Sequence, residues 1–166
     1  MNVVSRFAPM LLLLSLGVLV TDARGGTVQD AVQVSVNVVA TCVATTTPVS
    51  FGDVQLEQKE VATGQIIVKC NGLVPFEIAL DAGQSYDGTW RGISNGSRRI
   101  DYGLYSVLKK EWGDSGYDDT YPWGFPVPGV GTGNAETYTV IGVLFPGTLK
   151  VPPGIYFDTV VVTLHF

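Results

Sequence analysis

Residues 31–38 read A-V-Q-V-S-V-N-V, so apolar and polar side chains alternate without a break. An alternation with period two is the pattern of a β-strand with one buried face. Every large apolar residue in this stretch is β-branched, which favours an extended backbone over a helix. The residues on the apolar face are Val32, Val34, Val36 and Val38. The stretch predicts a strand with a valine face.

The same period returns at the other end of the sequence. Residues 154–166 read G-I-Y-F-D-T-V-V-V-T-L-H-F and predict a last strand that runs to the final residue. One face of that strand carries Val160, Val162, Leu164 and Phe166. The opposite face carries Thr159, Val161, Thr163 and His165. The sequence therefore predicts an apolar strand at the end, with no polar segment after it.

Short apolar runs separated by glycine, proline and asparagine fill the region between these two stretches. They predict strands at 64–70, 76–80, 100–108 and 138–145, a broken strand at 49–51, and a loop with a short edge strand at 81–97. Residues 111–134 are polar, aromatic and rich in glycine and proline, and are expected to be irregular. We expect an all-β, immunoglobulin-like sandwich in one domain.

The first residues have the pattern of an export signal. Arg6 precedes an apolar run at 7–20 that is too short for a transmembrane helix, and Thr21 and Ala23 fit the small-residue cleavage pattern. We expect a signal peptide at 1–23, with cleavage after Gly25 as the alternative. Export places Cys42 and Cys70 in an oxidising compartment, where they are expected to form a disulfide.

Several kinds of function are disfavoured by the composition. The formal net charge is −5 and the basic residues form no patch, so no nucleic-acid partner is expected. His165 is the only histidine and is expected to face solvent, which leaves no general base for an enzyme. Asp114, Asp118 and Asp119 do not have the spacing of a calcium loop. We expect no catalysis, no metal and no cofactor.

The two ends of the sequence suggest a shared function. If the sandwich lacks its final strand, the gap leaves core residues and a strand edge open, and a segment from another chain can fill it. The valine strand at residues 32–38 suits that role. From the residues alone, the alternative that residues 32–38 form the first strand of their own domain is equally good.

A resemblance to a known family favours donation. The run at 154–166 resembles the C-terminal signature of the spore coat protein U domain family, which includes the archaic chaperone–usher pilins. Further similar features, in the same order, are the valine strand ending in Cys42, the Phe51-Gly52 pair, the strand from Gly64 to Cys70, the run at 101–105 and Trp112-Gly113-Asp114. The segment at 116–128 departs from the pattern.

The resemblance implies an incomplete immunoglobulin-like fold that is completed by a donor strand from a neighbouring subunit. It implies a donor segment at 24–41 with the four valines as donor residues, and a domain at 42–166 whose acceptor edge includes Val160, Val162, Leu164 and Phe166. The implied partners are a periplasmic chaperone, an outer-membrane usher and neighbouring pilin subunits. The implied function is that of a structural pilus subunit, exported through the periplasm, in surface adhesion or biofilm formation.

Two alternatives remain open at this point. The first is a free-standing secreted spore or cell coat protein. The second is a carbohydrate-binding sandwich that uses an aromatic platform made of Trp90, Trp112, Tyr117, Tyr121 and Trp123. A binding module would stay monomeric and need these aromatic residues, whereas a pilin would polymerise and need the valine strand.

Overall fold

A computed structural model describes residues 27–55, 58–145 and 151–166. The expected signal peptide at 1–23 lies outside the described residues. The chain divides into two parts, one ending at Asn37 and one from Val38 to Phe166, and each is considered separately. In the first part, residues 27–37 belong to no strand.

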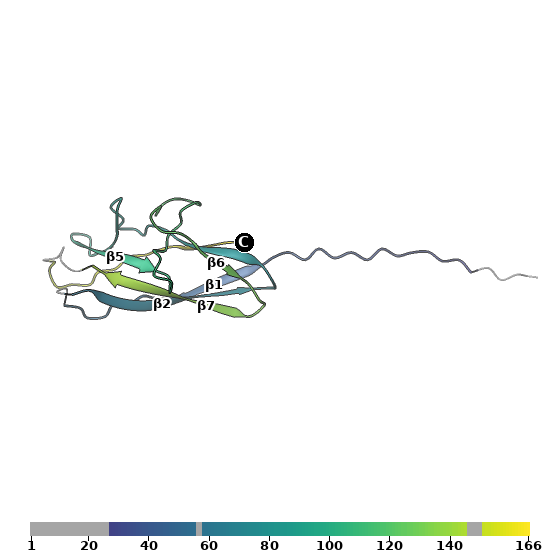
Figure 1. The fold of residues 1–166 in the computed structure, drawn as a ribbon, viewed down its shortest axis with the longest axis horizontal. Helices are drawn as coiled ribbons and strands as arrows, with labels where there is room; N and C mark the ends of the chain where they lie inside the picture. The colour runs from purple at the N-terminus through teal and green to yellow at the C-terminus, as the bar shows by residue number, and fades with distance from the viewer. Residues whose placement is uncertain (1–26, 56–57, 146–150) are drawn as a thin grey trace, which may run out of the picture. The chain divides into compact units, whose positions relative to one another are not determined.

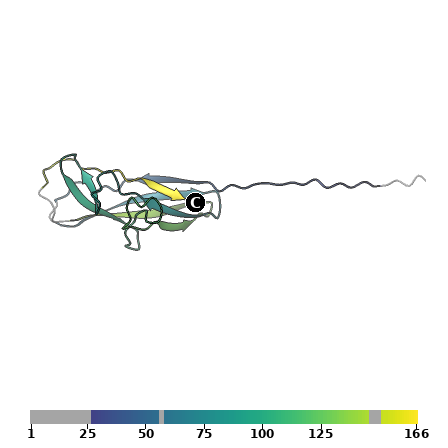
Figure 2. The ribbon, with the colours of Figure 1, turned by 90° about the horizontal axis from the view of Figure 1, so that it is seen from above.

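The described residues of the second part form eight strands in two antiparallel sheets. Figures 1 and 2 show how these strands are layered. The strands are β1 Cys42–Thr47, β2 Glu60–Cys70, β3 Pro75–Leu80, β4 Arg91–Ser94, β5 Arg99–Tyr105, β6 Val127–Val130, β7 Ala135–Leu144 and β8 Val162–His165. One sheet has the order β1-β2-β7-β5-β4 and the other the order β6-β3-β8. The described residues contain no helix that is long and apolar enough to cross a membrane. The all-β prediction is confirmed.

The core lies where the inner faces of the two sheets meet. In β2 the side chains of Ile66, Val68 and Cys70 are buried, and residues between them are exposed or half-buried. This alternation matches a strand that has one face on the core. The second sheet and the loop after β5 supply other buried residues, which include Phe76, Ile78, Leu80 and Trp112. Trp112 donates its indole N–H to the Ile78 carbonyl at 2.8 Å, which ties that loop to β3.

The strand predicted at 31–38 does not form, the one predicted at 100–108 ends at Tyr105, and the strands differ from the expectations in further places. The first strand covers Cys42–Thr47, whereas the expected broken strand at 49–51 is not a strand. The segment at 111–134, expected to be irregular, contains β6. The expected last strand at 154–166 is a strand only at Val162–His165, because Phe157 instead bridges to Ser94 of β4. Pairing with β3 makes residues 127–130 a strand, whereas Val49 and Phe51 pack over Gly64 and Gly142 and pair with no strand.

Candidate functional site: an open groove between two sheet edges

An open groove of about 830 Å³ lies over the core. One of its walls is the segment at 46–54, which runs from the end of β1 past Val49 and Phe51. The other wall is the segment at 154–162, which leads into β8. Side chains from both sheets form the floor, namely Ile66, Leu80, Ile100, Tyr102, Leu104, Val140 and Leu144.

The floor of the groove is part of the hydrophobic core. All seven floor residues are buried, and Leu80 and Leu144 are only 2% and 1% exposed. The floor itself is closed to water, whereas apolar side chains of the two walls, such as Val49, Phe51 and Val160, are only partly buried. Partly open apolar surface of this kind can be covered by a partner. The chemistry of the floor fits an apolar side chain.

The two sheet edges beside the groove are open. β1 pairs only with β2, and β8 pairs only with β3, within the part of the chain that the structure describes. The other two outer strands are protected. β4 exchanges two backbone hydrogen bonds with Phe157, at 2.9 and 3.1 Å through Ser94, and β6 contains Pro128. Since proline and covering segments block strand addition, the available edges are β1 and β8.

Two glycines shape the wall at 46–54. A Cβ atom added at Gly64 would lie 2.8 Å from the Thr47 carbonyl oxygen and 2.9 Å from Cγ2 of Val49. One added at Gly142 would lie 2.5 Å from Cγ1 of Val49 and 3.0 Å from Cζ of Phe51. The missing side chains leave a hollow in the sheet, and Val49 and Phe51 occupy it. The open groove therefore depends on glycine at both positions.

A hydrogen-bonded carboxylate fixes the opposite wall. Asp158 accepts a hydrogen bond from the Tyr102 hydroxyl at 2.6 Å and one from the Gln84 backbone N–H at 2.9 Å. Burial raises the pKa of the Tyr102 hydroxyl above its ordinary value, and donation to Asp158 raises it further. Asp158 thus ties the segment before β8 to β5 and to the loop after β3.

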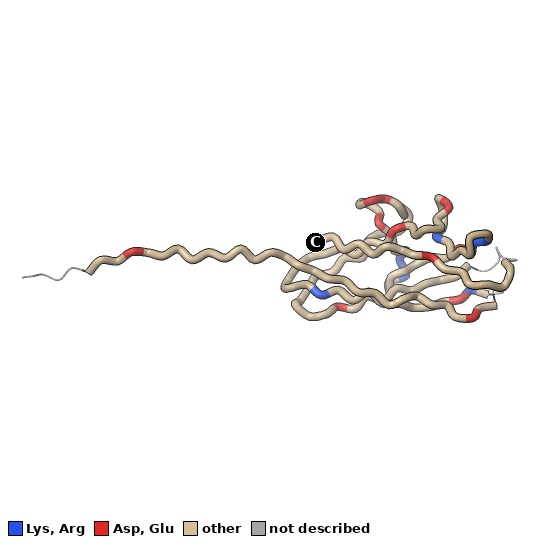
Figure 3. Tube along the Cα trace, turned by 180° about the vertical axis from the view of Figure 1, so that it is seen from behind, with Lys and Arg blue, Asp and Glu red and all other residues tan. Residues whose placement is uncertain are grey.

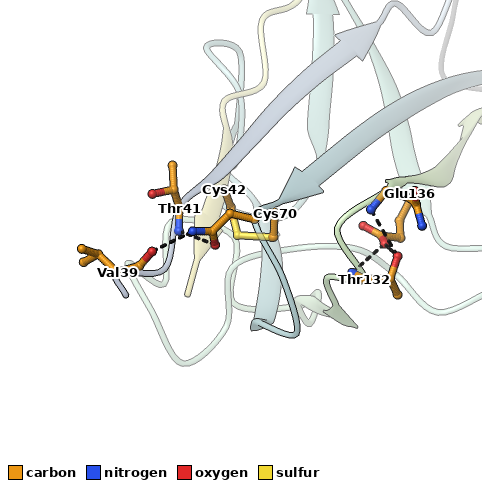
Figure 4. Close-up of a disulfide and its surroundings, with 8 residues drawn as sticks. Val39, Thr41, Cys42, Cys70, Thr132 and Glu136 are labelled. Atoms are coloured by element: carbon orange, nitrogen blue, oxygen red, sulfur yellow. Dashed lines mark hydrogen bonds between the residues drawn. A yellow bond between two sulfur atoms is a disulfide. The ribbon is translucent and has the colours of Figure 1, made fainter. Parts of the chain in front are cut away.

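A disulfide and several hydrogen bonds hold the start of β1 to the end of β2 (Figure 4). Cys42 and Cys70 form the disulfide expected from the sequence, and they lie opposite each other where β1 pairs with β2. Beside it, the Asn71 side chain donates to the Val39 carbonyl at 2.7 Å and accepts from the Thr41 N–H at 3.1 Å. The Asn71 backbone N–H donates to the Thr41 carbonyl at 3.0 Å. We call residues Val39–Thr41 the root of the N-terminal segment.

The structure brings half of the predicted acceptor residues to the groove. Val160 and Val162 line it, whereas Leu164 packs against the core farther along β8. Phe166 is 58% exposed and borders a separate, shallower depression next to Tyr117. The wall at 46–54 was not among the predicted acceptor residues. Its signal in the sequence was the apolar pair Val49 and Phe51 in the broken strand expected at 49–51, since two large apolar residues need a packing partner.

The four predicted donor valines are not part of either sheet. Val32, Val34, Val36 and Val38 are each between 80% and 92% exposed, and residues 27–41 form no strand. The structure therefore does not use this segment as the first strand of its own domain. Asp30 is the only charged residue between residues 27 and 41 (Figure 3).

The aromatic platform considered from the sequence does not form as one surface. Trp112 and Tyr121 are 1% and 0% exposed and belong to the interior. Trp112 is held there by its hydrogen bond to Ile78, and Tyr121 by the buried Asp114, which accepts hydrogen bonds from the backbone N–H groups of Thr120 and Tyr121 at 2.9 and 2.6 Å. No group of three metal-ligating side chains occurs among the described residues.

Comparison with known proteins places the fold in a family. The sequence model of the Spore Coat Protein U domain matches residues 28–163. A solved structure with a similar fold is the crystal structure of the CsuC–CsuE chaperone–tip adhesion subunit pre-assembly complex from the archaic chaperone–usher Csu pili of Acinetobacter baumannii. The TM-score is 0.55 at 19% sequence identity, and the match covers 78% of this chain and 40% of that chain. A search among curated proteins gave no match. With most of its length matched by the family model, the chain belongs to the Spore Coat Protein U domain family.

Proposed function

We propose that this protein is a structural, non-catalytic subunit of a chaperone–usher pilus and polymerises by donor-strand exchange. The observation that carries the proposal is the groove with its two open edges, β1 and β8, in a chain whose valine segment joins neither sheet. An extended segment from a second copy would add backbone hydrogen bonds at an open edge and set its valines on the floor.

The apolar contact is large enough to hold subunits together. Burying four valines contributes roughly 1.5–3 kcal/mol each, or about 6–12 kcal/mol before the segment is ordered. The partly buried side chains of the walls, such as Val49, Phe51 and Val160, gain as well, because an inserted strand would remove them from water. The groove suits valine because its floor is apolar. The one polar group on the floor is the Tyr102 hydroxyl, which already donates a hydrogen bond to Asp158.

The position of the root relative to the end of β8 favours one direction of insertion for the donor strand. The root lies beside Cys70, at the end of the domain where β3 begins and β8 finishes, because Glu77 pairs with His165 (Figure 1). A donor antiparallel to β8 keeps its own domain at the opposite end of the acceptor. Each subunit then receives a segment at one end and extends its own at the other. Such a head-to-tail contact is heterologous and produces a linear fibre.

The partners follow from the same proposal. An empty groove needs temporary cover during export, so we propose a periplasmic chaperone that occupies it, an outer-membrane usher that receives the subunit, and neighbouring subunits as the final occupants. The chaperone–subunit complex found among similar folds supports the first of these. We further propose a signal peptide at 1–23, a donor segment at 24–41, a surface location, and a contribution to adhesion or biofilm formation.

The test compares two charge substitutions on opposite faces of the segment. Val36→Asp puts a carboxylate on the valine face, and Ser35→Asp puts the same charge on the other face one residue away. We expect Val36→Asp to abolish linear polymers, because an unpaired carboxylate would enter an apolar groove. Ser35→Asp should assemble as the parent does. The measurements are gel filtration and electron microscopy of the mature proteins.

Two results would count against the proposal. If both variants and the parent stay monomeric, the chain is a self-contained secreted module such as a coat protein. If both variants polymerise as the parent does, the valine face is not the donor face. Adding a synthetic peptide of residues 27–38 to Val36→Asp should raise its thermal midpoint, and the same peptide carrying Val36→Asp should not.

A further inference from the structure

The valine face of the N-terminal segment has a charged boundary. Asp30 has the same parity as Val32, Val34, Val36 and Val38, so in an extended chain it lies on the same face as the valines. It is also exposed, and its carboxylate accepts a hydrogen bond from the Ala31 N–H at 2.8 Å. The face therefore changes from apolar to anionic within one strand repeat.

The groove contains nothing that would neutralise this carboxylate. Of the described residues that line it, only Asp53 and Asp158 are charged, and both are acidic. Asp158 is already engaged with Tyr102 and Gln84. At any depth in the groove, Asp30 would be an unpaired carboxylate above an apolar floor, which is a costly environment for a charge.

The other end of the segment is fastened. Three hydrogen bonds join Asn71 to the root, two through its side chain and one through its backbone N–H. The disulfide holds Cys42, the next residue, to the end of β2. A donor that moved so that residues 39–41 entered the groove would have to break the root hydrogen bonds.

Strand register can change only in steps of two here. A shift by one residue would turn the valines outward and put Gln33, Ser35 and Asn37 on the floor. A shift by two in one direction would bring Asp30 into the groove. A shift by two in the other direction would bring the root into the groove.

Building on the proposed donor-strand exchange, we propose that Asp30 and Asn71 are positioning residues that set the register of the inserted strand from its two ends. Asp30 stops the donor from entering too far toward its N-terminal side, and Asn71 stops the root from being drawn in. The inserted stretch is then residues 31–38. The occupant is a second copy of this chain, and the groove accepts it in one register.

Disulfide trapping in assembled polymers shows which acceptor residue lies next to a given donor residue, and so identifies the register of the inserted strand. The donor position is Ser35→Cys, on the polar face. Acceptor cysteines are placed one at a time on the matching face of β8, at Thr163 and His165, and of the segment that leads into it, at Thr159 and Val161. Neighbouring acceptor sites differ by two residues, so each reports one register. The parent polymer should give one dominant cross-link.

The two positioning variants should shift the cross-link in opposite directions. In the antiparallel arrangement, Asp30→Val should raise trapping at the site two residues nearer Gly154. Asn71→Ala should raise trapping at the site two residues nearer Phe166. An increase of about tenfold over the parent at the new site would correspond to about 1.4 kcal/mol of lost register preference. Gln33→Val is the matched control, since it adds the same side chain on the opposite face and should leave the pattern unchanged.

The outcomes separate this inference from the proposed function. A single unchanged cross-link in both positioning variants, within normal polymers, overturns the inference and leaves donor-strand exchange standing. A shift in the predicted directions supports both. If the parent forms neither polymers nor cross-links, the proposed function fails and the inference fails with it.

Discussion

Arg91, in the edge strand β4, is fully buried and has only neutral acceptors. Its guanidinium donates to the carbonyls of Leu80 and Trp112 at 2.9 and 2.8 Å, and to the Asp81 carbonyl through two nitrogens. It also lies 3.8 Å from the centre of the Tyr121 ring, where a cation–π contact is favourable. Burial lowers its pKa from the ordinary value. One side chain thus joins β3, β4 and the loop after β5.

We expect Arg91→Met to destabilise the domain. Three carbonyl oxygens would lose their donors, and each buried acceptor left without a partner costs about 1–3 kcal/mol, so the loss should reach about 3 kcal/mol. The measurement is the urea unfolding midpoint, with the exposed Arg98→Met as control. A loss no larger than that of the control would contradict the structural role of Arg91.

Tyr102 makes the stability of the domain sensitive to alkaline pH. Its folded-state pKa is raised by burial and by donation to Asp158, whereas an unfolded tyrosine titrates near pH 10. The unfolded chain therefore loses this proton first, and stability present below about pH 10 falls as the pH rises. We expect the urea midpoint to drop between about pH 9 and about pH 11. Tyr102→Phe should show a smaller drop than Tyr156→Phe, and equal drops would refute this explanation.

At the scale of elements, the wall at 46–54 depends on the surface of β7. Gly142→Ala would place a methyl group 2.5 Å from Val49, so the wall must move into the groove. We expect a stability loss of about 1–3 kcal/mol from overpacking, together with a reduced polymer yield. Gly72→Ala is the control, because nothing lies within 4 Å of a Cβ atom there. Normal polymer yield from Gly142→Ala would show that the wall does not limit access.

The stability of β1 depends on the Cys42–Cys70 disulfide more than that of an inner strand would. It has β2 on one side only, and its residues after Cys42 are exposed. Replacing both cysteines by alanine should cost about 3–4 kcal/mol, since the closed loop restricts the unfolded chain. Amide hydrogen exchange should rise first in β1, while β7, paired on both sides, stays protected. Equal exchange in the two strands would rule out selective fraying of β1.

For the whole molecule, donation and acceptance should be separable. Val36→Asp disables donation but keeps the groove, and Gly142→Val, which obstructs the groove, keeps the donor segment. We expect each variant alone to remain monomeric. An equal mixture should form dimers that do not grow, since only the Gly142→Val variant can donate its segment and only the Val36→Asp variant has an open groove to accept it. Analytical ultracentrifugation distinguishes these species. Growth of the mixture into fibres would indicate contacts other than donor-strand insertion.

Much of this organisation could be predicted from local patterns. The alternation in β2, β3 and β7 identified strands because one face of each packs on the core. The disulfide was predictable because the expected export signal implies an oxidising compartment, where the two cysteines of the sequence can pair only with each other. The valine segment was recognisable, but its separation from both sheets was not, since the same alternation suits a strand of its own domain.

The sequence by itself determined the all-β fold, the strand faces and the valine segment with Asp30 at its boundary, because these depend on the order of neighbouring residues. The tertiary structure alone decided where the groove lies, that Val49 and Phe51 form its wall over Gly64 and Gly142, and that Phe157 covers β4. It also decided that Arg91 is buried. These features depend on contacts between residues far apart in the chain, and sheet edges become open or covered only when the sheets have assembled.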